Sequence, residues 1–149
     1  THHPSSAASD VYKRQKENEF GLEITETAEL EDTKKAGESL ERLKKRGIKI
    51  ALDDFGAGYA SLKYIRDLPI DVVKLDRHFT SNISDPSTSR LIKFVSDVCA
   101  ELNLEMIGEG IETEKEKNMM IEIGCLTGQG FLMHMPSFIE DIKKENNDG

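Results

Sequence analysis

The segment IALDDFGAGYASL, residues 50–62, decides the fold assignment, because it sets two aspartates directly behind an apolar run. The run IAL is typical of a strand that is covered on both faces, and a glycine-rich turn follows Asp53 and Asp54. Two adjacent carboxylates at the end of a buried strand are costly unless a cation lies beside them. The segment therefore predicts a strand whose carboxyl end meets positive charge.

Strand and helix patterns alternate on both sides of this segment. We expect strands at 20–25, 48–54, 71–76, 104–109 and 126–133, and helices at 33–46, 60–68, from Asp85 to about 102, and from Thr113 to 123. Five strands joined by four helices predict an α/β fold with a parallel sheet and right-handed crossovers.

Local signals support three of these helices. Gly47 stands where the first helix needs a left-handed residue behind its end. Thr113 and Glu116 have the spacing of a capping box. In the third helix, the residues that recur at helical spacing are Leu91, Val95, Val98 and Leu102.

Acidic residues recur where the expected strands end. Alternate residues of a strand share a face. Lys74 therefore shares a face with Val72, and Asp53 shares one with Ala51. In the same way Glu23 shares a face with Thr25, and Glu109 comes two residues after Ile107. The strand ends carry five acidic residues and one lysine, a net −4, namely Glu23, Asp53, Asp54, Asp76, Glu109 and Lys74. The carboxyl ends of parallel strands meet at one edge, and carboxylates are the ligands that Mg²⁺ and Mn²⁺ prefer. The sequence thus predicts a site for two divalent cations.

Bulk composition excludes several protein classes. The chain has 149 residues, 37% hydrophobic content and a net charge of −8. An acidic chain does not suit a nucleic-acid polymer, which needs a basic face. There is no run of 18 apolar residues and no signal peptide, so we expect no membrane segment here and a cytoplasmic location with reduced Cys99 and Cys125. The full-length protein can still be membrane-anchored through other regions.

Three regions are expected along the chain. Residues 1–15 lack apolar periodicity, and we interpret them as a disordered tail or a scar of cloning or sequence assembly. Residues 16–140 carry the alternating pattern and form the domain. Residues 141–149 are polar and are expected to fray.

Five segments together resemble the EAL domain family, the bacterial phosphodiesterases that hydrolyse cyclic di-GMP. They match the family's motifs in order and spacing: LEITE (22–26), DDFGAGYASL (53–62), VVKLDRHF (72–79), GEGIET (108–113) and QGFLMHMP (129–136). The resemblance implies a (β/α)8 TIM-type barrel, of which this chain holds about five βα units. It also implies hydrolysis of cyclic di-GMP to linear pGpG.

The same resemblance implies a role for each matching residue. Glu23 and Asp53 would bind one Mg²⁺ or Mn²⁺, with Asp53 bridging to a second ion held by Asp54 and Glu109. Glu109 would also act as general base. Lys74 would orient the attacking water and balance charge.

Further positions would support this site. By resemblance, Asp76 and Gln129 are supporting residues. Glu26 and the turn after Asp54 would link the metal site to a homodimer interface; the turn residues are Phe55, Gly56, Gly58 and Tyr59. Sensory or diguanylate-cyclase domains would be partners in the full-length protein.

The chain also departs from the family pattern. Gly108 replaces the usual alanine, and Met133, His134 and Met135 would alter the wall of the pocket near the guanine. The Glu-Ala-Leu segment and an asparagine ligand are not present. We therefore expect the chain alone to be poorly stable, weakly metal-binding and inactive.

Two readings of function stay open. The chain is part of an active phosphodiesterase, or it is part of a degenerate EAL module that binds cyclic di-GMP or a protein partner without turnover. The reading frame upstream of residue 16 would discriminate between them.

Overall fold

A single sheet organises the part of the chain that the structure, a computed structural model, describes: residues 21–26, 30–56, 61–125, 127–130 and 133–138. Its six strands pair in chain order, the first four pairings parallel and the last antiparallel. The strands are β1 (Leu22–Thr25), β2 (Ile50–Phe55), β3 (Val72–Leu75), β4 (Glu105–Glu109), β5 (Thr127–Gly130) and β6 (Met133–Phe138). The predicted α/β fold with five parallel strands is confirmed.

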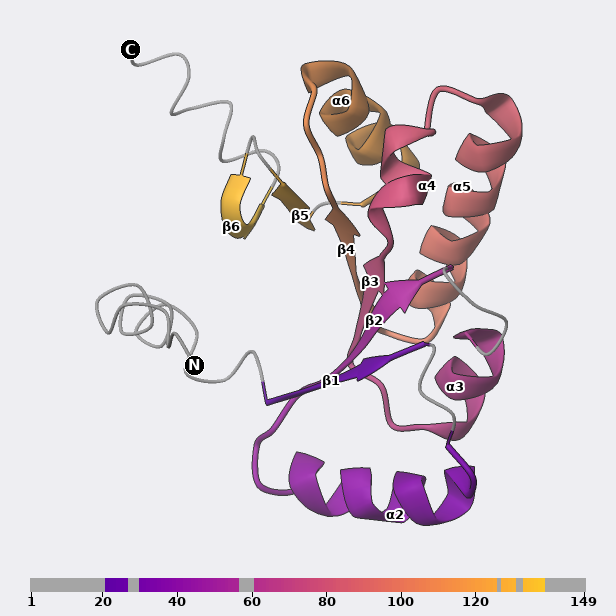
Figure 1. Cartoon of the computed structure of the whole chain (residues 1–149), viewed down its shortest axis with the longest axis vertical. Helices are drawn as coiled ribbons and strands as arrows, with labels where there is room; N and C mark the ends of the chain where they lie inside the picture. Colours follow the sequence, from indigo (N-terminus) through magenta and orange to yellow (C-terminus); the bar gives the residue numbers. More distant parts are fainter. Residues whose placement is uncertain (1–20, 27–29, 57–60, 126, 131–132, 139–149) are drawn as a thin grey trace.

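The helices in the described residues gather on one side of the curved sheet (Figure 1). They are α2 (Thr33–Lys44), α3 (Ser61–Asp67), α4 (Arg77–Ser81), α5 (Pro86–Glu101) and α6 (Glu114–Ile123). None of these helices is long and apolar enough to cross a membrane. The expected tails, 1–15 and 141–149, lie outside the described residues.

The predicted helix ends are confirmed. Thr113 Oγ1 accepts the N–H of Glu116, whose carboxylate accepts the N–H of Thr113 in return, so α6 begins with the expected capping box. Gly47 has a φ of +83°, the left-handed geometry expected just after α2. Asp85 caps α5 by accepting the N–H of Thr88.

The two faces of the sheet bury different side chains. One face joins the helices in the main core, to which it contributes Ile50, Leu52, Val73, Leu75 and Met106. The other face carries a small separate cluster, which we call the inner layer and which consists of Ala51, Val72 and Ile107. Side chains alternate along a strand, so Asp53, Lys74 and Glu109 lie one step beyond these residues on the same face. The sheet thus brings the predicted site residues to one side, as the period-two pattern indicated.

The structure corrects the predicted face of α5. Of the predicted residues, Val95 is buried as expected, but Leu91 and Leu102 are 47% and 51% exposed, and the helix buries Ile92 and Cys99 instead. Ile92, Val95 and Cys99 also recur at helical spacing in the sequence. Contact with the sheet selects the second set.

Two elements were not predicted. The short α4 begins directly after β3. The antiparallel β6 follows β5, where one strand was expected over 126–133. The five parallel strands and four helices that were predicted are present, and α4 and the antiparallel β6 are added to them.

Candidate functional site

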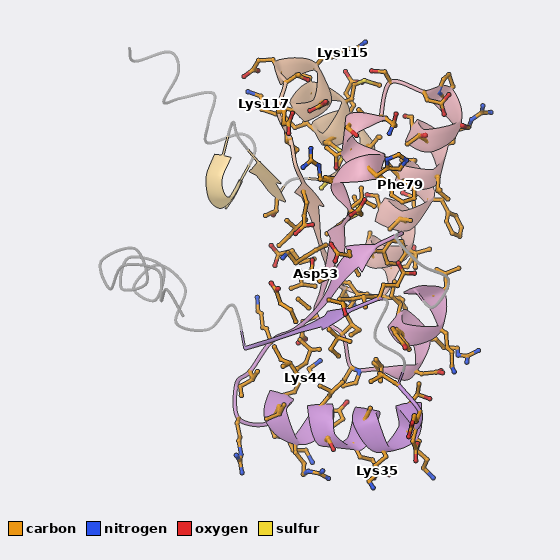
Figure 2. The ribbon with its side chains drawn as sticks, in the orientation of Figure 1. Lys35, Lys44, Asp53, Phe79, Lys115 and Lys117 are labelled. Carbon is orange, nitrogen blue, oxygen red and sulfur yellow. The ribbon has the colours of Figure 1, made fainter. Side chains whose placement is uncertain are left out.

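A buried lysine lies at the centre of the acidic strand ends. Lys74 Nζ is 3.0 Å from Glu23 Oε1, 3.4 Å from Asp53 Oδ1 and 3.0 Å from Glu109 Oε1. The lysine is only 7% exposed. Its partners come from β1, β2 and β4, so three strands converge on the side chain of β3. Figure 2 shows Asp53 on the side of the sheet away from α5.

Asp54 joins this group through an irregularity at the end of β2. The β2–β3 register shifts between Leu52 and Phe55, and Asp54 has a φ of +54°. Its N–H donates to Asp53 Oδ1 over 2.9 Å. Bulges of this kind often redirect side chains beside functional sites.

Three carboxylates are close enough to share a cation. One oxygen each of Asp53, Asp54 and Glu109 lies within 4.8 Å of the others, the one such group among the described residues. Glu23 is not part of that trio and reaches it through Lys74. A trio of hard oxygen donors fits Mg²⁺ or Mn²⁺ in chemistry and spacing.

The charges of the site are not balanced. Burial raises the pKa of Asp54, and the negative charges of Asp53 and Asp76 raise it further, against the opposing effect of Lys74. Burial likewise raises the pKa of Glu109, although the hydrogen bond from Lys74 acts to lower it. One ammonium therefore does not neutralise the cluster, and the residues present fit a bound divalent cation.

Lys74 itself stays charged. Burial alone would lower the pKa of its ammonium group, but the hydrogen bonds to Glu109 and Glu23 outweigh that effect and hold the pKa above its ordinary value. The side chain is thus a fixed positive charge and a hydrogen-bond donor near neutral pH. It is not a base.

The remaining predicted residues occupy three different settings. Asp76 caps α4, with its Oδ1 accepting the N–H of His78 over 2.9 Å. Glu26 is 2% exposed, and its Oε2 accepts the N–H of Gly56 over 2.8 Å. Gln129 stands opposite Glu109 in the β4–β5 register. The structure does not describe the side chains of Gln129 and of residues 133–135.

The turn after Asp54 is described in part. Phe55 is the last residue of β2 and packs in the main core. Gly58 and Tyr59 lie outside the described residues. Gly56 packs tightly against Phe79 of α4, a contact that sequence reasoning did not assign. The only sequence signal for it is the aromatic residue that ends VVKLDRHF.

Comparison with known proteins gives consistent matches. The profile described as EAL domain matches residues 3–136. A curated relative named cyclic di-GMP phosphodiesterase PA2567, from Pseudomonas aeruginosa, is 36% identical over 123 residues, which cover 82% of this chain and 21% of the relative. This chain therefore spans about a fifth of that relative.

Two solved structures share the fold. The EAL domain of Mycobacterium smegmatis DcpA has a TM-score of 0.73 at 32% identity, covering 86% of this chain and 58% of that one. A manganese and cyclic di-GMP complex of Klebsiella pneumoniae BlrP1 has a TM-score of 0.70 at 27% identity, covering 93% and 36%.

Proposed function

The chain belongs to the EAL domain family, and from this premise we propose that its acidic cluster forms part of a two-metal site that hydrolyses cyclic di-GMP to linear pGpG. The observation that carries the proposal is the convergence of carboxylates from three strands on Lys74, with Asp53, Asp54 and Glu109 in reach of one cation. The relatives support it, because one is named a cyclic di-GMP phosphodiesterase and another is a complex with manganese and cyclic di-GMP.

We assign the metal ligands by resemblance to the family, and the grouping of Asp53, Asp54 and Glu109 supports the assignment. Asp53 would bridge two Mg²⁺ or Mn²⁺ ions, with Glu23 as a ligand of one and with Asp54 and Glu109 as ligands of the other. When bound, such ions supply Lewis-acid activation of water and stabilise charge on the phosphate.

Glu109 and Lys74 would divide the remaining chemistry. Burial raises the pKa of Glu109, which makes its carboxylate a better proton acceptor than an exposed glutamate. We assign it the role of general base. Lys74 holds a Glu109 oxygen over 3.0 Å, and it would supply a permanent positive charge beside the phosphate of a bound substrate. Asp76 and Gln129 would support this arrangement.

The wider context follows from the substrate. Cyclic di-GMP is an intracellular messenger, so the proposed enzyme acts in the cytoplasm. Glu26 and the turn of 55–59 would connect the site to a homodimer interface. Sensory or diguanylate-cyclase domains of the full-length protein would regulate it.

The experiment is a chromatographic assay of pGpG formation with Mn²⁺ or Mg²⁺. It is run on the chain alone and on a chimera that adds the part of the DcpA EAL domain that this chain does not cover. We expect background rates for the chain alone and turnover by the chimera. Glu109→Gln should lower the chimera's rate at least about 100-fold, whereas Glu122→Gln, on the exposed surface of α6, should leave it unchanged.

Two outcomes would contradict the proposal. Cyclic di-GMP binding by the chimera without pGpG formation would favour the degenerate binding module. Equal rates for the Glu109→Gln and Glu122→Gln chimeras would remove Glu109 from the chemistry.

A further inference from the structure

The turn behind β2 is clamped from two sides at Gly56. On one side its N–H donates to Glu26 Oε2 over 2.8 Å. On the other side lies the ring of Phe79: a Cβ placed on Gly56 would be 1.9 Å from Phe79 Cε2 and 2.8 Å from Cδ2 and Cζ. Real Cβ atoms do not approach other atoms so closely, so the ring occupies the space that any other residue would need.

This clamp lies two residues from a strained metal-ligand candidate. Asp54 has a φ of +54°, a conformation that costs a non-glycine residue about 1 kcal/mol. Such a conformation persists only where the surroundings hold it. The chain ahead of it is held in the β1–β2 ladder, where Thr25 pairs with Asp53. The chain behind it is held at Phe55, whose carbonyl accepts the N–H of Asp76 over 3.1 Å, and at Gly56.

The position of Phe79 is set by the same junction. Asp76 begins α4 as its N-cap, and its carbonyl accepts the N–H of Phe79 over 3.0 Å. The short helix thus delivers the ring to the end of β2, where Figure 2 shows it. A function for this five-residue helix follows, because it connects the strand that carries Lys74 to the turn that carries Asp54.

We propose that Phe79 is a positioning residue whose ring holds Gly56, and through it the bulge at the end of β2, so that Asp54 presents its carboxylate beside Asp53 and Glu109. The inference rests on the proposed function in one respect, that this trio binds a divalent cation. The role requires no contact of Phe79 with the ion or the substrate. Loss of outer residues that orient metal ligands typically weakens metal affinity about 10–100-fold.

The test measures Mn²⁺ affinity of the full chain by electron paramagnetic resonance, so its readout does not depend on turnover. Phe79→Ala should weaken binding about 10–100-fold, and Phe79→Leu, which keeps an apolar side chain, should recover part of it. The matched control is Phe94→Ala on α5, where the phenylalanine is 55% exposed; its affinity should equal that of the unaltered chain.

A double-mutant cycle isolates the contact. Gly56→Ala introduces a methyl group that collides with the ring, and removing the ring in Gly56→Ala/Phe79→Ala removes the collision. The loss of Mn²⁺ affinity caused by Gly56→Ala should therefore be smaller in the Phe79→Ala background.

The outcomes are separable. Mn²⁺ affinity of Phe79→Ala within twofold of the unaltered chain, or strictly additive losses in the cycle, would overturn the positioning role and leave the proposed function intact. Absence of Mn²⁺ binding by the unaltered chain would overturn the positioning role, whereas the proposed function is tested separately by turnover of the chimera. Should Phe79→Ala unfold in circular dichroism, Phe79→Leu decides by itself: an unchanged affinity refutes the role and a several-fold loss supports it.

Discussion

Replacing Lys74 with methionine is the most informative single perturbation of the site. The change keeps the apolar stem and removes the only positive charge among the strand-end residues whose side chains the structure describes, leaving Glu23, Asp53 and Glu109 without their common partner. The side chains of Asp53 and Glu109 are 18% and 19% exposed, whereas that of Glu23 is 44% exposed and contributes little.

The expected cost follows from the pairs that the buried Lys74 makes with the half-buried Asp53 and Glu109. Removing one member of a buried ion pair costs about 3–5 kcal/mol, because the other charge is left uncompensated. Since both partners keep some exposure to water, we take the low end, about 3 kcal/mol. For a domain of this size, that loss lowers the unfolding midpoint by about 6–12 °C.

The cost should depend on metal and on pH. A bound Mn²⁺ supplies the missing charge, so the destabilisation should be largest in EDTA and should shrink with saturating Mn²⁺. Burial already raises the pKa of Glu109 above its ordinary 4.5, and loss of Lys74 would raise it further. A folded state that binds the proton more tightly than the unfolded chain gains stability as pH falls toward that value, so Lys74→Met should be least damaging at mildly acidic pH.

The assay is thermal unfolding followed by circular dichroism, in EDTA and in Mn²⁺, at pH 7.5 and 5.5. The matched control is Lys93→Met, which removes an exposed ion pair with Asp97 on α5 and should cost less than about 0.5 kcal/mol under every condition. Equal midpoints for Lys74→Met and Lys93→Met in EDTA would refute the reasoning. So would a destabilisation by Lys74→Met that Mn²⁺ does not change.

Three smaller predictions follow from other features. Asp54→Asn should raise the free energy of unfolding of the metal-free chain, because burial and a neighbouring charge disfavour the Asp54 carboxylate. It should also weaken Mn²⁺ binding at least about tenfold. A lower stability of this variant in calorimetry would contradict the first expectation. Burial raises the pKa of Cys99 to about 11 and of Cys125 to about 12, so mass spectrometry should show slow alkylation by iodoacetamide at pH 8 in the folded chain and rapid alkylation in urea; equal rates would contradict it. Thr113→Ala removes the capping box of α6 and should cost about 1 kcal/mol, seen as a lower urea midpoint, and an unchanged midpoint would argue against the cap.

The sequence predicted those parts of the fold that depend on local periodicity. The strand that carries Asp53 and Asp54 near its carboxyl end, the face shared by Val72 and Lys74, and the capping box at Thr113 all depend on residues within one turn or one strand, and all three are observed. The convergence on Lys74 was predictable because parallel strands place their carboxyl ends at one edge.

The remaining features depend on packing between distant segments. The α5 sequence has two apolar stripes, and the sheet, which the helix pattern does not encode, selects the one that contains Ile92 and Cys99. The helix α4 is too short for a periodic signal. The contact between Phe79 and Gly56 joins two motifs of the sequence, and no spacing rule within either one indicates it.

The inner layer of Ala51, Val72 and Ile107 limits where the chain can gain or lose residues during evolution. Each of these small or branched residues precedes a charged one by two positions, so losing or gaining a single residue inside β2, β3 or β4 would move the charged site residue toward the main core and a core residue into the inner layer. We therefore expect the fold to tolerate insertions in the connecting segments and to be lost when a residue is inserted within a strand. A library of single-codon deletions across 44–56 should lose folded protein sharply from Ile50 onward and tolerate losses just before it.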